Sequence, residues 1–165
     1  MPTPTYTPLA NITLAATASS VAFSSIPATY RDLIIVVRAS MSSAVTTALT
    51  TKLNNDSGAN YSFVFMANGN GSTSSYGEGG VTSLSTVAFA DLTNTQITTS
   101  QIQVMDYSAT DKHKTVLVRA DRVNFGTSAT ANRWANTAAV TSVNFSVASG
   151  AMAIGSTFSL YGIAS

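Results

Sequence analysis

The segment Tyr30–Ala39 reads YRDLIIVVRA, in which the aliphatic run Leu33–Val37 lies between charged neighbours. This run is far shorter than the roughly 20 apolar residues that a membrane-spanning helix needs. Its length and its β-branched residues favour a strand that is covered on both faces. We therefore expect Leu33–Val37 to form a central strand of a β-sheet and to carry the core of the protein.

Outside this run, apolar and polar residues alternate with the period of two that is typical of half-buried strands. In Gln96–Tyr107, for example, Ile102 and Val104 fall on one side and Gln101 and Gln103 on the other. Such segments recur along the chain between turn-forming residues, and no helical period separates them. The pattern predicts an all-β, single-domain β-sandwich, jelly-roll-like, with eight to ten antiparallel strands, about the number such folds use.

Three stretches are expected to lie outside the strands. Asn68–Gly80 and Asn124–Asn132 are rich in residues that favour turns, so both are predicted to be loops. Residues 2–8 contain Pro2, Pro4 and Pro8, which have no N–H to donate to a sheet. We expect an extended N-terminal arm over residues 1–9, outside any sheet, and a sandwich domain over residues 10–165. A frayed terminus is the alternative for the arm.

The composition excludes several classes of function. The chain has eight Lys and Arg, seven Asp and Glu, a net charge of +1 and no cysteine. Disulfides, zinc–thiolate sites and thiol nucleophiles are therefore excluded, and the charge gives no electrostatic basis for binding nucleic acid. The N-terminal residues lack the basic and apolar regions of a signal peptide. We expect a protein that stays in the cytoplasm after synthesis, with no cofactor, metal or membrane partner.

Few residues are candidates for catalysis. His113 is the only histidine, it lies between two lysines, and a Ser-His-Asp site would need Asp106 or Asp111 beside it. No Gly-x-Ser-x-Gly motif accompanies it, so His113 is expected on a solvated turn. A glycosidase-like pair of carboxylates and a calcium loop at 54–57 are alternatives with weaker support. The chain is predicted not to be an enzyme.

Binding residues are proposed on the arm, in the glycine-rich segment and beside the tryptophan. Exposed aromatic residues and arginine are typical anchors of protein interfaces. Tyr76 is expected to contact a sugar or a neighbouring subunit, or to fill its own loop, and Trp134 has a core position as its alternative. The candidate partner-binding residues are Pro4, Tyr6, Pro8, Tyr76, Arg133 and Trp134.

Five segments of the chain resemble small virion proteins of tailed bacteriophages, especially phages of aquatic bacteria. They are FSSIPATYRDLIIVV (Phe23–Val37), NNDSGANYS (Asn54–Ser62), DYSATDKHKTVLVRAD (Asp106–Asp121), RWANTAAVTSVNF (Arg133–Phe145) and GSTFSLYGI (Gly155–Ile163). The resemblance runs in order through most of the chain. Asn68–Gly80 does not take part in it.

The resemblance implies a non-enzymatic structural component of a virion. The expected role is a capsid decoration, or cement, protein on the capsid exterior that binds the major capsid protein, assembled in the cytoplasm of the bacterial host. A homotrimer at local threefold positions is expected from the symmetry of such shells. The alternative is a tail-associated or fibre module that binds carbohydrate on the host surface. The low charge agrees with binding by shape, because with few charges there is little Coulomb attraction for salt to screen.

Overall fold

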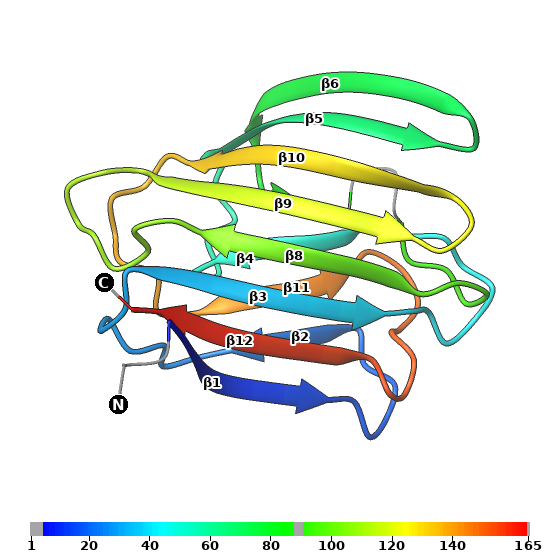
Figure 1. Cartoon of the computed structure of the whole chain (residues 1–165), viewed down its shortest axis with the longest axis horizontal. Coiled ribbons are helices and arrows are strands. Elements are labelled where there is room, and N and C mark those ends of the chain that lie inside the picture. The colour runs from blue at the N-terminus through cyan, green and yellow to red at the C-terminus, as the bar shows by residue number, and fades with distance from the viewer. Residues whose placement is uncertain (1–4, 88–90, 165) are drawn as a thin grey trace.

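The computed structural model of the chain describes residues 5–87 and 91–164 and shows an all-β protein. Twelve antiparallel strands form two sheets, and the described residues contain no helix (Figure 1). The all-β class and the two-sheet, sandwich-like arrangement predicted from the sequence are thus confirmed. The number of strands exceeds the predicted eight to ten, and the jelly-roll connectivity stays a prediction.

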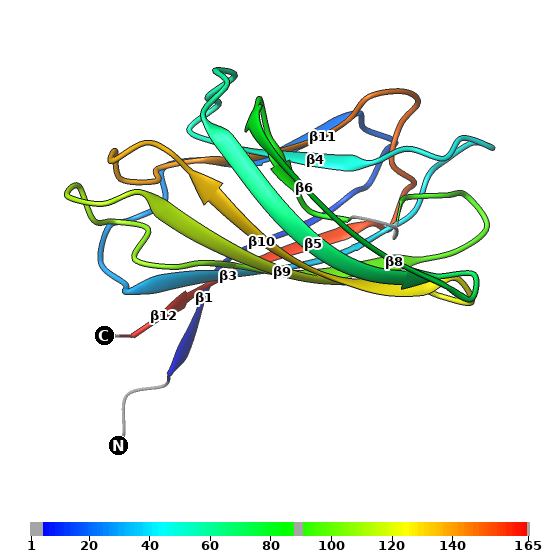
Figure 2. The same ribbon diagram turned by 90° about the horizontal axis from the view of Figure 1, so that it is seen from above.

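The larger sheet has eight strands and the smaller has four. In spatial order, the larger sheet consists of β1 (Tyr6–Thr13), β12 (Thr157–Ile163), β3 (Asp32–Ala39), β8 (Thr98–Val104), β9 (Lys114–Arg122), β10 (Gly126–Trp134), β5 (Tyr61–Gly69) and β6 (Ser72–Val81). The smaller sheet consists of β2 (Ser20–Phe23), β11 (Val143–Val147), β4 (Leu49–Leu53) and β7 (Leu84–Ser85). Figure 2 shows β4 and β11 in a layer of their own beside the long sheet.

The core lies between the two sheets and is built on β3, as expected. β3 pairs with β12 on one side and with β8 on the other, so Leu33–Val37 is central. Leu33 and Ile35 are fully buried, whereas Val36, on the opposite face, is 42% exposed. The prediction that this strand is covered on both faces is therefore wrong at Val36, because the smaller sheet covers only one face of the larger one.

Both segments predicted to be loops contain strands. Asn68–Gly80 includes the end of β5, a tight turn and most of β6; Asn70 and Gly71 both have positive φ, 50° and 79°. Two such residues between paired strands form the type I′ turn that suits a two-residue hairpin, for which Asn-Gly is the preferred sequence. The turn residues are therefore only the tip of a long hairpin, and polar strands continue on both sides of it.

The segment Asn124–Asn132, predicted to be a loop, forms most of β10. The prediction is wrong because β10 inverts the usual pattern and buries its polar residues. Its polar Ser128, Thr130 and Asn132 face the interior and are buried, while Ala129 and Ala131 face outward. Asn132 is accommodated by hydrogen bonds: its Oδ1 accepts from the Ser85 N–H at 2.9 Å, and its Nδ2 donates to the Ser85 carbonyl at 3.2 Å. These two bonds join the larger sheet to β7, so a buried polar side chain connects the layers.

The N-terminal segment also differs from the expected arm. Residues 2–4 lie outside the described residues, but Tyr6, Thr7 and Pro8 belong to β1 and pair with β12. The prediction that residues 2–8 lie outside any sheet is therefore wrong from Tyr6 onward. Proline is tolerated because β1 is an edge strand and its register shifts between Pro8 and Ala10, the kind of position at which strands accept proline.

Candidate functional site

Trp134 belongs to the core and is not an exposed anchor. It ends β10, is fully buried, and stacks on Tyr61 with ring centroids 6.4 Å apart. Its indole Nε1 donates a hydrogen bond of 2.8 Å to Oδ2 of Asp56, which also accepts from Asn60. Of the two positions considered for Trp134, the structure shows the core position. The turn that follows β4 supplies the carboxylate that satisfies the buried indole.

The Asp56–Trp134 bond makes the folded state sensitive to acid. The Trp134 indole, followed by Asn60 and the Gly58 N–H, lowers the pKa of Asp56 below its ordinary value of 3.8. A carboxyl group with a lowered pKa stabilises the folded state above the unfolded-state pKa, and the contribution disappears as the pH falls through the folded-state pKa. We therefore expect the free-energy difference between the wild type and Asp56→Asn to shrink below about pH 4, the ordinary range for Asp.

Denaturant titrations between pH 6 and pH 2, about the range over which acidic groups ionise, would measure this difference. The fluorescence of Trp134, the only tryptophan, reports on the same contact. A gap between the two proteins that stays constant over the whole range would contradict the assignment of the bond to an ionised Asp56.

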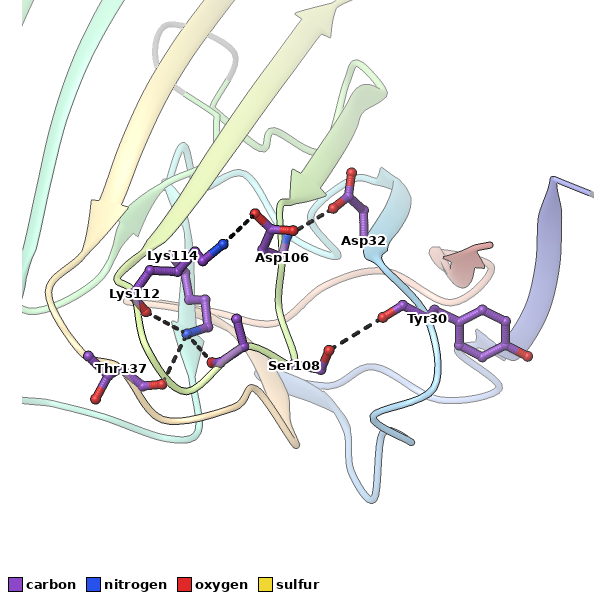
Figure 3. A network of polar contacts seen from close by, with 8 residues as sticks. Tyr30, Asp32, Asp106, Ser108, Lys112, Lys114 and Thr137 are labelled. Atoms are coloured by element: carbon purple, nitrogen blue, oxygen red, sulfur yellow. Dashed lines mark hydrogen bonds and ion pairs between the residues drawn. The ribbon is translucent and has the colours of Figure 1, made fainter. Parts of the chain in front are cut away.

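A network of polar contacts holds the loop before β9 (Figure 3). Lys114 is fully buried, and its Nζ donates to the carbonyl oxygens of Ala109, Lys112 and Thr137 at 2.7, 2.9 and 3.2 Å. Burial is the main cause that lowers the pKa of Lys114. Because all three donors are used and the side chain is inaccessible, Lys114 organises this loop and offers no amine to a substrate.

In the same network, Asp106 connects the loop to β3. The Asp106 N–H donates to Oδ1 of Asp32 at 2.9 Å, and the Asp106 carboxylate faces Lys112 Nζ at 3.4 Å (Figure 3). His113 is exposed, as predicted, and its Nδ1 lies 2.7 Å from a guanidinium nitrogen of Arg133. The structure therefore places His113 beside Arg133. The Asp106 carboxylate faces Lys112 instead, and the Asp106 N–H binds Asp32 at the start of β3.

The remaining candidate binding residues do not come together. Tyr6 and Pro8 are exposed on β1, whereas Tyr76 is 53% exposed on β6, at the opposite edge of the larger sheet. Arg133 is exposed near the end of β10. Pro4 lies outside the described residues. The five candidate residues that the structure describes therefore do not form one continuous patch on the chain.

A feature that sequence reasoning missed is an apolar groove on the outer face, which we define as the face of the larger sheet turned away from the smaller sheet. The groove has a volume of about 390 Å³. Its apolar floor and walls are formed by Val64, Met66, Leu117, Ala129 and Ala131.

Sheet register explains why these five residues meet. Leu117 on β9 pairs with Ala131 on β10, and Ala131 pairs with Val64 on β5. Ala129 pairs with Met66 in the neighbouring row. The alanines leave a low strip between taller side chains, and Val64, Met66 and Leu117 are 55%, 67% and 43% exposed.

The signal for this groove was present in the sequence. β5 carries apolar residues on both faces, as Phe63, Val64, Phe65 and Met66 show, and an uninterrupted apolar run in a strand covered on one face only must expose half of its residues. Clustered exposed apolar side chains are typical of interaction sites. The groove is bordered by Gln101 and Gln103 on β8 and by Arg119 on β9, so its rim is polar on this side.

A second surface cluster lies on the opposite face of the same hairpin. Phe63, Phe65 and Tyr76 have ring centroids between 6.1 and 6.2 Å apart. Tyr76 Oη donates to Oε2 of Glu78 at 3.2 Å, and this bond is the main cause that raises the pKa of Tyr76. The two phenylalanines are only half-buried, because the smaller sheet ends at β7 and does not cover them completely. We call these three residues the aromatic cluster.

The part of the chain that the structure describes contains neither a group of metal-binding side chains nor a membrane-spanning helix. In residues 5–87 and 91–164, no three His, Cys, Asp or Glu side chains form a group that could hold a metal ion. None of the described segments is a helix with the length and hydrophobicity needed to cross a membrane. Comparison with protein families finds no match. Comparisons with curated proteins and with solved structures find none either.

Proposed function

We propose that this chain is a non-enzymatic structural protein of a tailed-phage virion, a capsid decoration protein that docks on the major capsid protein. The observation that carries the proposal is the apolar groove on the outer face. An exposed apolar strip with a polar rim is the usual anatomy of a protein interface. The resemblance of five chain segments to small virion proteins supports the identity of the partner.

The charge distribution supports a contact made by shape and apolar burial. Arg119 is the one charged residue that lines the groove among the described residues, and the whole chain carries a net charge of only +1. Coulomb attraction between exposed groups is screened over about 10 Å at 0.1 M salt. A decoration protein that binds through the groove is therefore expected to keep its affinity for the capsid when the ionic strength changes.

Replacing Leu117 by aspartate is expected to weaken capsid binding at least about tenfold, because it puts an unpaired charge into the contact. The purified chain is added to capsids assembled without it, and the bound fraction is measured by co-sedimentation. Thr115→Asp is the matched control, since Thr115 is exposed on the same strand and face but outside the groove. The control is expected to bind within about twofold of the wild type, as surface substitutions usually have small effects.

Equal binding of Leu117→Asp and the wild type would exclude the groove as the docking surface. Failure of the wild type to bind any capsid would overturn the decoration proposal itself. Circular dichroism and thermal melting verify that both variants are folded.

The aromatic cluster supports a second candidate, a tail-associated or fibre module that binds host carbohydrate. Tyr76 exposes its ring beside a carboxylate, and an aromatic face next to a hydrogen-bonding group suits a ligand with one apolar and one polar side. Binding to host cells that is lost in Tyr76→Ala, with no binding to capsids, would favour this candidate.

A further inference from the structure

The two edge strands of the larger sheet differ in whether a further strand could pair with them. β1 carries Pro8 and a register shift next to it, and natural proteins use such features to block edges. β6 is longer, with 10 residues, and contains neither proline nor lysine. Its register with β5 is regular from Ser72 to Gly79 and shifts only at the end of the strand, between Gly79 and Val81, where Gly80 has a positive φ of 72°. Figure 1 shows β6 as the outermost strand, with no strand beyond it.

The turn geometry shows which backbone groups of β6 point outward. Gly69 and Ser72 flank the two-residue turn and are paired in the ladder, and the first and fourth residues of such a turn are ordinarily joined by a backbone hydrogen bond. Because antiparallel pairs alternate between bonded and non-bonded, Ser74, Tyr76 and Glu78 direct their backbone groups toward β5. Thr73, Ser75, Gly77 and Gly79 therefore direct theirs away from the sheet. These groups form a regular row of donors and acceptors with a period of two residues.

The side chains on this edge allow another strand to approach. β6 is almost entirely exposed and consists mostly of Ser and Gly. Glu78 is its one charged residue, and its carboxylate already accepts the Tyr76 hydroxyl. An edge without proline or basic side chains lacks two of the usual barriers to strand addition.

We propose that two copies of this chain pair through β6, antiparallel and about a twofold axis, so that their eight-stranded sheets join into one continuous sheet. A row of alternating donors and acceptors is complementary to itself when reversed, which is the condition for an isologous interface. Strand addition at an open edge is an established mode of recognition. This inference goes beyond the capsid-docking proposal and uses a different surface.

The aromatic cluster supports a second copy as the occupant. A twofold axis perpendicular to the sheet leaves the same face of both copies on the same side. The two Tyr76 rings then lie on one face of neighbouring strands, where cross-strand aromatic pairs stabilise a sheet. The paired cluster buries rings of Phe63 and Phe65 that the smaller sheet leaves half-covered.

The mass of the purified full-length chain, measured by sedimentation equilibrium over a range of concentrations, tests this interface. The wild type is expected to be a dimer or an even multiple of one. Ser75→Lys, which puts a charge at the exposed edge, is expected to weaken association at least about tenfold, because lysine is a common edge-blocking residue. Asn11→Lys makes the same charge change on β1 and is expected to leave the mass unchanged.

Cysteine scanning along β6 gives an independent readout, because the chain has no native cysteine. Single-cysteine variants from Ser72 to Gly79 are oxidised, and the position nearest the twofold axis is expected to give a disulfide-linked dimer, as two Cα atoms about 5.5 Å apart can be bridged. A monomeric wild type overturns the proposal. An association that Ser75→Lys does not weaken, or one without any crosslink along β6, places the interface elsewhere and overturns it as well.

Discussion

Replacement of Trp134 by alanine is expected to lower the free energy of unfolding by about 3–5 kcal/mol, the range typical of deleting a large buried aromatic side chain. Trp134 is fully buried and stacked on Tyr61. Its removal leaves a cavity between the sheets and takes away the donor that faces Asp56. Because most domains are stable by only about 5–15 kcal/mol, this loss is a large share of the total.

Chemical denaturation followed by far-UV circular dichroism measures the effect, since the variant has lost its tryptophan fluorescence. Trp134→Phe helps to separate the two causes, because it keeps most of the apolar volume and loses the indole N–H. Tyr6→Ala is the matched control, because Tyr6 is an aromatic residue of the same sheet that is 55% exposed. It is expected to cost less than about 1 kcal/mol. Equal losses in Trp134→Ala and Tyr6→Ala would contradict the core position of Trp134.

The fold class could be predicted because the alternation of apolar residues follows from the pleat of a strand and needs no tertiary information. Leu33–Val37 was predicted to be central for a different reason, because its apolar run is uninterrupted and rich in β-branched residues. Where β10 reverses the pattern, the same rule fails. Ser128, Thr130 and Asn132 face the core, and only the position of β7 explains why Asn132 can be buried with its hydrogen bonds satisfied.

The hairpin of β5 and β6 shows a second limit. Asn70-Gly71 is a recognisable turn, but glycine and serine have low strand propensity, so the strand that follows reads as a loop. Its pairing with β5 is a non-local property. Gly126 gives another example: a Cβ at this position would lie 2.0 Å from the Asn68 carbonyl oxygen. The glycine is needed because two hairpins approach closely, and the sequence alone does not show that approach.

The candidate site could be predicted only in part. Tyr76 was identified as an exposed aromatic residue, and the structure places it in a cluster with two phenylalanines. The apolar groove was missed because a single exposed apolar residue is common on protein surfaces. Only strand register brings Leu117 beside Ala131 and Val64. Surface features assembled from three strands depend on register, which is set by the whole sheet.

Ile35→Ala is the other substitution with a large expected effect, a loss of about 2–5 kcal/mol in the free energy of unfolding. Ile35 is fully buried at the centre of β3, where it pairs with Leu160 on β12 and with Ile102 on β8. Both partners are themselves buried. A shortened side chain at this point removes contacts with the neighbouring strands β12 and β8, and the surrounding sheet cannot easily close the cavity.

Val36→Ala is the control that tests this argument most directly. Val36 is the next residue on the same strand, but it points to the outer face and is 42% exposed. The backbone pairing and the β-branched character of the replaced residue are nearly the same in the two cases, so burial is the main difference. Val36→Ala is expected to cost no more than about 1 kcal/mol, the span of intrinsic strand propensities. If equilibrium unfolding gave equal losses for the two variants, strand propensity and not burial would set the stability of β3, and the sandwich core would have to be centred on other strands.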